Sequence, residues 1–248
     1  MIIMDDGIGL NAELDRPAGR ETCPLCVIFH GFTGHSEERH ILAVSKAMNE
    51  IGVATLRADL YGHGKSGGSF REHTLYKWLT NALTLIDFAR NLDFVTKLFL
   101  CGHSQGGLTA MLAAAMKRDA VSALIPLSPA CMIPEWARRG ELLGVRFDPE
   151  HVPETLCSWD GRTLNGNYVR VAQTIDVERA IDGYAGPVLI VHGDRDEAVP
   201  FEEGKRAAAR YRNATLIRIP GDDHCYNFHL EEVTDVVGNW MRNTVLCL

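Results

Sequence analysis

The chain has 248 residues, of which 46% are hydrophobic, and a formal net charge of −7. This length and composition can bury one large core, and α/β folds of this size are commonly single domains. The negative charge argues against nucleic acid or an anionic membrane surface as the main partner. No segment is apolar enough to span a bilayer, and residues 1–6 lack the features of a signal peptide. Seven cysteines without framework spacing predict reduced thiols in a cytoplasmic protein.

The first ninety residues predict a hairpin followed by alternating strands and helices. The hairpin is expected over residues 1–13, with its turn at Asp6 and Gly7. After it, short apolar runs typical of buried strands alternate with apolar residues at helical spacing. In chain order these elements are a strand at 25–29, a helix with the apolar face Ile41, Val44, Met48 and Ile51, a strand at 53–58 and a helix at 75–91.

The stretch from 97 to 115 joins a predicted strand to a helix through a sharp turn. Residues 97–101 form an apolar run, and apolar residues recur at helical spacing from Leu108 to Ala115. Between them stands Gly102-His103-Ser104-Gln105-Gly106, which matches G-x-S-x-G. Glycines on both sides keep Cβ atoms out of the tight crossing, and the helix N-terminus lies behind the serine. In this context the motif predicts that Ser104 is a nucleophile.

A nucleophilic serine needs a base and an acid, which follow it in the order acid, then histidine, on this kind of sheet. Two later strands are predicted, at 188–191 and 215–219. Asp194 and Asp196 follow the first of them, and His224 follows the second. The carboxyl ends of parallel strands share one edge of an open sheet, where ligands bind. We therefore expect Ser104, one of the two aspartates and His224 to meet there.

An oxyanion hole requires two backbone N–H groups directed at the developing negative charge. The residue after the nucleophile, Gln105, is expected to supply one of them. The other is expected from Phe32, which follows His30 and Gly31 just after a predicted strand. The alternative is an ordinary glycine turn in which His30 is satisfied by local hydrogen bonds.

The remaining pattern adds a strand at 121–127, which Pro126 is expected to end, and a final helix with one apolar face. This alternation predicts an α/β fold: a mostly parallel sheet with helices on both faces. Residues 131–175 interrupt it with three prolines and several aromatic residues. Long loops in compact domains are usually functional, which favours a cap over a plain surface excursion. The expected organisation is a core at 1–130, a cap at 131–175 and the rest of the core at 176–248.

The chain resembles the α/β-hydrolase fold esterases from about residue 24 onward, and within them the bacterial cinnamoyl (feruloyl) esterases. The motifs that carry the resemblance are His30-Gly31-Phe32, Gly102-His103-Ser104-Gln105-Gly106-Gly107, His192-Gly193-x-x-Asp196-x-x-Val199-Pro200 and Asp223-His224-Cys225. The resemblance implies a triad of Ser104, His224 and Asp196, in preference to Asp194, which is expected to bond its own loop. Asp222 and Asp223 are expected to be solvated or to position the histidine loop.

For the substrate, the resemblance implies a small-molecule ester, a hydroxycinnamate ester in the first instance, and no cofactor. It places Trp159 in the acyl pocket, and Tyr168 is expected to offer its hydroxyl to ring substituents. The alternative for Trp159 is a core position within the cap. Two other functions stay open: another acyl hydrolase, such as a monoacylglycerol lipase or thioesterase, and a non-enzymatic binding protein. The oligomeric state also stays open, a homodimer included.

Two further motifs predict no function. The stretch Gly62-His63-Gly64-Lys65-Ser66-Gly67 matches G-x-G-x-x-G, but no helix pattern begins there, so nucleotide binding is not expected. Cys23 and Cys26 have the spacing of a zinc or redox pair, but no second pair exists and a strand buries part of the motif. We expect two core thiols and no metal site.

Overall fold

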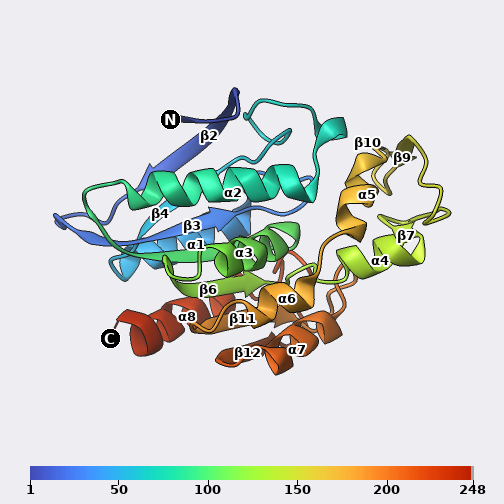
Figure 1. The fold of residues 1–248 in the computed structure, drawn as a ribbon. Helices are drawn as coiled ribbons and strands as arrows, with labels where there is room; N and C mark the ends of the chain where they lie inside the picture. Colours follow the sequence, from blue (N-terminus) through green and yellow to red (C-terminus); the bar gives the residue numbers. More distant parts are fainter. Residues whose placement is uncertain (247–248) are drawn as a thin grey trace.

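The computed structural model describes residues 1–246 and contains an eight-stranded sheet with the order β1-β2-β4-β3-β5-β6-β11-β12 (Figure 1). The strands are β1 Ile2–Asp5, β2 Ile8–Asp15, β3 Cys23–Phe29, β4 Ala54–Ala58, β5 Val95–His103, β6 Val121–Leu127, β11 Val188–Gly193 and β12 Ala214–Ile219. All neighbours from β4 to β12 are parallel, whereas β1 and β2 join in antiparallel fashion. The predicted α/β fold with a mostly parallel sheet is confirmed.

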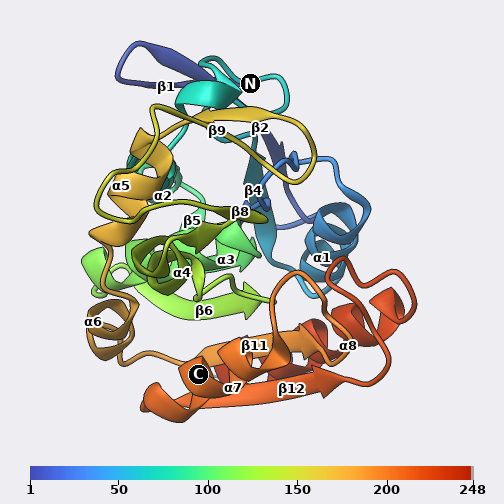
Figure 2. The same ribbon diagram turned by 90° about the vertical axis from the view of Figure 1, so that its right-hand side faces the viewer.

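Helices cover both faces of this sheet. They are α1 Arg39–Glu50, α2 Leu75–Arg90, α3 Gln105–Met116, α6 Val177–Asp182, α7 Phe201–Arg210 and α8 Leu230–Trp240, with a π-helical turn at Met241–Leu246. The apolar sides of α1 and α8 pack in one core, and those of α2, α3, α6 and α7 in the other. Figure 2 shows α1 and α8 on one side of the sheet and α2 and α6 on the opposite side. Burial of these two apolar faces holds the helices to the sheet.

The N-terminal hairpin is confirmed: β1 pairs with β2 in antiparallel register. Its turn residues have positive φ angles, 45° at Asp6 and 78° at Gly7. Two central residues with positive φ match the twist of the flanking strands, which is why Asp-Gly is a frequent hairpin turn.

Strand β6 reaches one residue past the position where we expected it to end. Pro126 lies opposite Gly102 of β5, and its missing N–H removes one bond from the ladder. Bonding continues beyond it, because Ser104 N–H donates to Leu127 O at 2.9 Å and Ser128 N–H to Val191 O at 2.8 Å. These bonds tie the turn of Ser104 to the ends of β6 and β11.

The segment predicted as a cap contains two short helices and two small hairpins. They are α4 Ile133–Arg139, β7 Glu141–Leu142, β8 Val145–Arg146, β9 Thr155–Cys157, β10 Thr163–Asn165 and α5 Asn167–Gln173. This segment shares an apolar cluster with Leu75 of α2, Leu108 of α3 and Val199, and Phe32 packs against this cluster. Phe32 follows β3 and Val199 follows β11, so the segment covers the carboxyl edge of the sheet. It lies at one end of the molecule in Figure 1 and faces the viewer in Figure 2.

Candidate active site

Ser104 occupies a strained turn between β5 and α3. Its φ of 57° and ψ of −120° lie outside the regions that residues with a side chain normally adopt. A Cβ at Gly102 would overlap the carbonyl oxygen of Gly106, and a Cβ at Gly106 would overlap the carbonyl oxygen of His30. Only glycine fits at these two positions, as the sequence motif predicts. Backbone strain of this kind is concentrated at functional sites.

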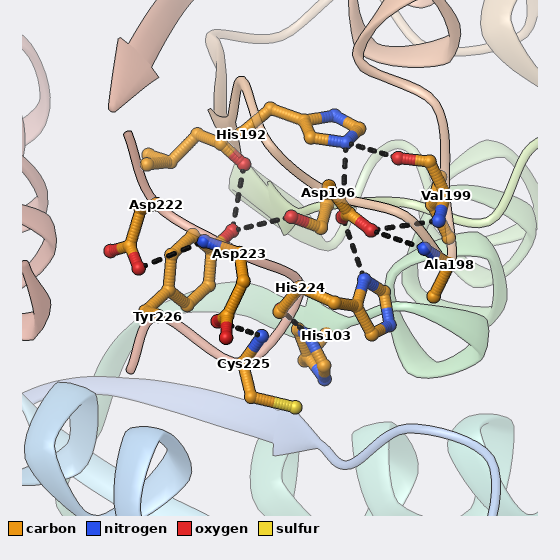
Figure 3. Close-up of polar contacts among 12 residues, drawn as sticks. His103, His192, Asp196, Ala198, Val199, Asp222, Asp223, His224, Cys225 and Tyr226 are labelled. Carbon is orange, nitrogen blue, oxygen red and sulfur yellow. Dashed lines mark hydrogen bonds and ion pairs between the residues drawn. The ribbon is translucent and has the colours of Figure 1, made fainter. Parts of the chain in front are cut away.

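His224 and Asp196 form a hydrogen-bonded pair on the loops after β12 and β11. His224 Nδ1 donates to Asp196 Oδ2 at 2.7 Å, and the side chain of Asp196 is fully buried. Asp196 Oδ1 accepts the backbone N–H groups of Ala198 at 2.9 Å and Val199 at 2.8 Å (Figure 3). Burial alone would raise the pKa of Asp196, but hydrogen bonds from His192 and His224 hold that pKa well below its usual range. The pair therefore joins an ionised carboxylate to an imidazole N–H.

Asp194 has a different environment. Its Oδ1 accepts the N–H of Gly221 at 2.7 Å, and its Oδ2 lies 3.5 Å from Arg218 Nη1. Both partners lie at the end of β12 or just beyond it, so Asp194 fastens its own loop to the neighbouring one. The structure brings Asp196, and not Asp194, to His224.

His103 links the loop of His224 to the turn of Ser104. His103 Nε2 donates to the carbonyl oxygen of His224 at 2.8 Å, and the two ring centroids are 4.6 Å apart. Ser104 follows His103 directly, so the hydrogen bond brings the histidine loop next to the serine. Within residues 1–246, Ser104 Oγ forms no hydrogen bond with His224; in free enzymes such contacts often tighten only when substrate binds.

The loop after β3 lies directly against Ser104. A Cβ at Gly31 would lie 3.1 Å from Ser104 Cβ. The carbonyl oxygen of Gly31 accepts from His30 Nδ1 at 2.8 Å and from the N–H of Gly34 at 3.1 Å. Because a trans peptide directs its N–H away from its carbonyl, these bonds orient the N–H of Phe32. In the described chain, neither Phe32 nor Gln105 uses its backbone N–H in a hydrogen bond, so both remain available to a ligand.

The two residues expected to bind the acyl group differ in exposure. Tyr168 is buried and donates its hydroxyl to Gln105 Oε1 at 2.7 Å, so this hydroxyl already has a partner. Trp159 is 70% exposed, and the alternative that it is a core residue of the cap is therefore wrong. A small apolar cavity of about 10 Å³ lies beside Tyr168 and is lined by Leu142, Leu143, Val145, Leu156, Ser158, Leu164, Tyr168 and Val169. The sequence neighbour of Trp159, Ser158, belongs to this lining.

Two acidic residues position the histidine loop, which is one of the two alternatives that the sequence left open for them. Asp222 is fully buried, and its carboxylate accepts the N–H groups of Phe228 and His229, both at 3.1 Å. The Asp223 carboxylate accepts the N–H of Cys225 at 3.1 Å. These bonds fix the backbone on both sides of His224.

The glycine turn near residue 62 surrounds a carboxylate of the protein itself. Asp59 accepts the N–H of Ser36 at 2.7 Å and the N–H of Lys65 at 2.8 Å. A Cβ at Gly64 would overlap this carboxylate, so the turn needs glycine for reasons of packing. The N–H of Lys65, which a nucleotide phosphate would need, is already used. Cys23 and Cys26 are buried and unpaired, and residues 1–246 hold no cluster of His, Cys, Asp and Glu suited to a metal ion.

Five of the buried histidines are held neutral. Burial lowers the pKa of His30 and His73 to about 3 and that of His40 and His63 to about 4, and it lowers the pKa of His103 well below its usual range. Each has at least one ring partner, and His63 contacts both His30 and His73. The region under the loop after β3 and beside Ser104 is therefore sensitive to protonation.

We expect the protein to lose stability steeply between pH 6.5 and about pH 4. Below pH 6.5 the unfolded chain binds protons at these five imidazoles, whereas the native protein excludes them until their lowered folded-state pKa values are reached. Unfolding at pH 5 should therefore take up about five protons from these side chains. Urea unfolding at pH 7, 6 and 5 measures this uptake as a slope. The variant His63→Gln should lower the slope by about one proton, and equal stability at pH 7 and 5 would contradict the expectation.

Known proteins and protein families match this chain over nearly its full length. A family model described as "Serine aminopeptidase, S33" matches residues 20–163, and one described as "TAP-like protein" matches residues 165–242. Est1E from Butyrivibrio proteoclasticus, solved with ferulic acid bound, is 63% identical with a TM-score of 0.98, and the match covers 99% of both chains. The chain belongs to the α/β-hydrolase family. This relation confirms the fold and the family that the sequence motifs predict.

More distant relatives of this α/β-hydrolase differ in length. Human ABHD12B is 26% identical over 89% of this chain and 61% of its own length. The human mitochondrial palmitoyl-protein thioesterase ABHD10 is 25% identical over 75% of this chain and 61% of its own length. The chain thus spans about three fifths of the length of these curated relatives. The solved mouse ABHD10 has a TM-score of 0.77 at 18% identity and covers 98% of both chains, which shows a shared fold.

Two residues of the site, His103 and His192, were not recognised from the sequence as contacts of the triad. Both are polar side chains at the ends of buried strands, in β5 and β11, and both are at most 3% exposed. A buried polar side chain needs a hydrogen-bond partner, so a histidine at the end of an apolar run is a usable signal. The partner itself comes from a distant loop, and the sequence does not identify it.

Proposed function

We propose that this α/β-hydrolase is a serine carboxylesterase that works through Ser104, His224 and Asp196. The main support is the hydrogen-bonded pair of His224 and buried Asp196 on the same edge of the sheet as the strained turn of Ser104. In the proposed reaction His224 Nε2 removes the proton of Ser104 Oγ, which attacks the ester carbonyl. Asp196 holds His224 in the tautomer with Nδ1 protonated and stabilises the imidazolium.

The proposed oxyanion hole consists of the backbone N–H groups of Phe32 and Gln105. Both belong to segments packed against Ser104, and both are free of other hydrogen bonds within residues 1–246. They would stabilise the negative charge on the carbonyl oxygen as the tetrahedral intermediate forms. The alcohol then leaves with a proton from His224, and water hydrolyses the acyl-enzyme by the same steps in reverse.

For the substrate we propose hydroxycinnamate esters. The support is the 63% identity to Est1E over nearly the full chain, together with the ferulic acid bound in the Est1E structure. Apolar side chains around the small cavity beside Tyr168 lie close to Gln105 and would line the pocket for a planar apolar acyl group. We propose that Tyr168 contributes its ring to this pocket, because its hydroxyl is already bonded to Gln105.

An ester panel tests this assignment against a second acyl hydrolase activity. A thioesterase or monoacylglycerol lipase is the alternative, and the similarity to ABHD10 is the observation that favours it. Methyl ferulate, a monoacylglycerol and an acyl-CoA should be compared by kcat/KM. We expect methyl ferulate to be the preferred substrate. A preference for acyl-CoA or monoacylglycerol would reject the proposed substrate class and retain the serine hydrolase.

Truncation of Trp159 tests its proposed contact with the acyl group. Trp159→Ala should lower kcat/KM on methyl ferulate by about 2- to 10-fold more than on a small acetyl ester, because an indole face adds stacking of about 0.5–1.5 kcal/mol. Trp159 is 70% exposed, so little core packing is lost. Tyr76→Ala, another exposed aromatic residue, is the control. Equal losses on both esters would remove Trp159 from the substrate site.

We further propose that the protein is located in the cytoplasm. A homodimer is the oligomeric state to be tested. Six cysteines within the described residues are unpaired, as expected for a reducing compartment. The same residues include no helix with the length and apolarity needed to cross a bilayer. Light scattering during size-exclusion chromatography gives the mass of the particle and decides between monomer and dimer.

A further inference from the structure

A second histidine touches the carboxylate that we assign as the triad acid. His192 lies at the end of β11 and is completely buried. Its Nε2 is 3.0 Å from the carbonyl oxygen of Val199 and 3.3 Å from Asp196 Oδ2. Figure 3 shows Asp196 between the rings of His192 and His224. Both neighbours of His192 Nε2 are acceptors, so this nitrogen must carry a proton.

The other side of the His192 ring is closely packed. A Cβ at Gly204 of α7 would lie 2.6 Å from His192 Nδ1, and the ring of Phe201 stands edge-on at a centroid distance of 5.6 Å. His192 Nδ1 has no hydrogen-bond partner in residues 1–246, which fits an unprotonated nitrogen. The charged or titratable groups that act on this region are Glu203 of α7, His103 of β5 and the pair itself. The packing of α7 thus fixes the ring with its Nε2–H at Val199 O and beside Asp196 Oδ2.

Four N–H groups lie close to the two carboxylate oxygens of Asp196. Oδ1 accepts two backbone N–H groups, whereas Oδ2 accepts the Nδ1–H of His224 and lies 3.3 Å from His192 Nε2, whose N–H donates to Val199 O at 3.0 Å. His224 changes its charge and shifts during each proposed catalytic cycle. His192, in contrast, takes no part in the proposed proton transfers. A carboxylate oxygen held by a fixed donor keeps its direction when the reacting partner moves.

We propose that His192 is a positioning residue for the triad acid: its Nε2–H holds Asp196 Oδ2 in line with His224 Nδ1. The proposal rests on the proposed triad, and it adds a residue that does not touch the substrate. His192 and His224 have opposite tautomers in this arrangement, one protonated on Nε2 and the other on Nδ1. The two protonated nitrogens face the same carboxylate oxygen, Asp196 Oδ2.

Paired substitutions test the role of the Nε2–H. Gln places an amide N–H at the same number of bonds from Cβ as His Nε2, whereas Met has similar bulk and no donor. His192→Met should lower both kcat and kcat/KM on methyl ferulate by about 10- to 100-fold, because the donor beside the charged carboxylate is lost. KM should change by less than about 2-fold. His192→Gln should recover most of this loss. Equal activity of His192→Met and the wild type would overturn the proposal, and so would equal losses in both variants.

A spectroscopic measurement on the wild-type protein tests the same proposal without depending on whether a variant folds. The 15N shifts of the His192 ring should show a proton on Nε2 and none on Nδ1. A proton on Nδ1 would overturn the proposal, because Nε2 could then not donate. The low-field proton signal of His224 Nδ1–H should also stay sharp in His192→Gln and broaden in His192→Met.

The variant Asp196→Asn separates this proposal from the proposed triad. If Asp196→Asn retains near-normal turnover, the triad assignment fails, and the role of His192 fails with it. If Asp196→Asn is inactive while His192→Met is fully active, the triad stands and only the positioning role is overturned. In the double variant, the His192→Met loss should disappear, because both substitutions act through the same carboxylate.

Discussion

Ser104→Ala is expected to lower kcat/KM for methyl ferulate by about 10⁴-fold or more and to leave the fold unchanged. The substitution removes the proposed nucleophile, and with it covalent catalysis, but it keeps the proposed oxyanion donors at Phe32 and Gln105. The residual rate should therefore still exceed the rate in water. The strain of the turn, with φ of 57°, is the same for alanine and serine, so thermal stability should change little.

Labelling with a fluorophosphonate probe gives an independent readout of the same serine. The wild type should be labelled, and Ser104→Ala should not. Ser122→Ala in β6 is a suitable control, because it removes a hydroxyl from a neighbouring strand away from the proposed machinery. A folded wild-type protein that stays unlabelled would reject the enzyme assignment in favour of a binding protein. Near-normal turnover of Ser104→Ala would assign the chemistry to another residue.

Asp196→Asn is expected to reduce kcat by about 10⁴-fold, whereas Asp194→Asn should stay within about 10-fold of the wild type. Asparagine at 196 can donate an N–H toward His224 Nδ1, which favours the tautomer that leaves Nε2 protonated and unable to act as base. Asp194 contacts the N–H of Gly221, and an asparagine carbonyl can still accept that bond. Both substitutions are neutral and lie on the same loop, but only Asp196 contacts His224.

Both variants should be compared by acylation rate and by thermal unfolding. Asp196→Asn removes an ionised, buried carboxylate but keeps its size, so a loss of activity in a folded protein reports the tautomer of His224. A larger loss for Asp194→Asn would transfer the acid role to Asp194 and place the structural pairing of Asp196 and His224 in doubt.

The fold follows from the sequence because its signals are local. Strands such as β3 and β11 contain apolar runs, helices such as α1 and α8 have one apolar face, and the strained turn at Ser104 requires glycines that stand beside it in the chain. The expected bounds differ from the observed ones by a few residues. Strand β5, for example, extends from Val95 to His103 because pairing with β3 and β6 continues past its apolar residues.

The site follows from the sequence only in part, because its contacts are long-range. The order of motifs indicates His224 and an aspartate after β11, and the resemblance favours Asp196. Hydrogen bonding then separates Asp196 from Asp194, two residues apart on one loop, and this depends on how the loop closes on β12. The exposure of Trp159 depends in the same way on the packing of the cap hairpins, which local pattern does not determine.

The hydrogen bond from Tyr168 to Gln105 connects the segment over the sheet to the first residue of α3. Gln105 carries a proposed oxyanion N–H on its backbone and the acceptor for Tyr168 on its side chain. The segment 131–175 is therefore no interchangeable module. A chimera that receives this segment from a relative without a tyrosine at the position of Tyr168 would leave a buried amide oxygen unpaired, one residue from the nucleophile. Grafts that alter acyl specificity should transfer the tyrosine and the glutamine together.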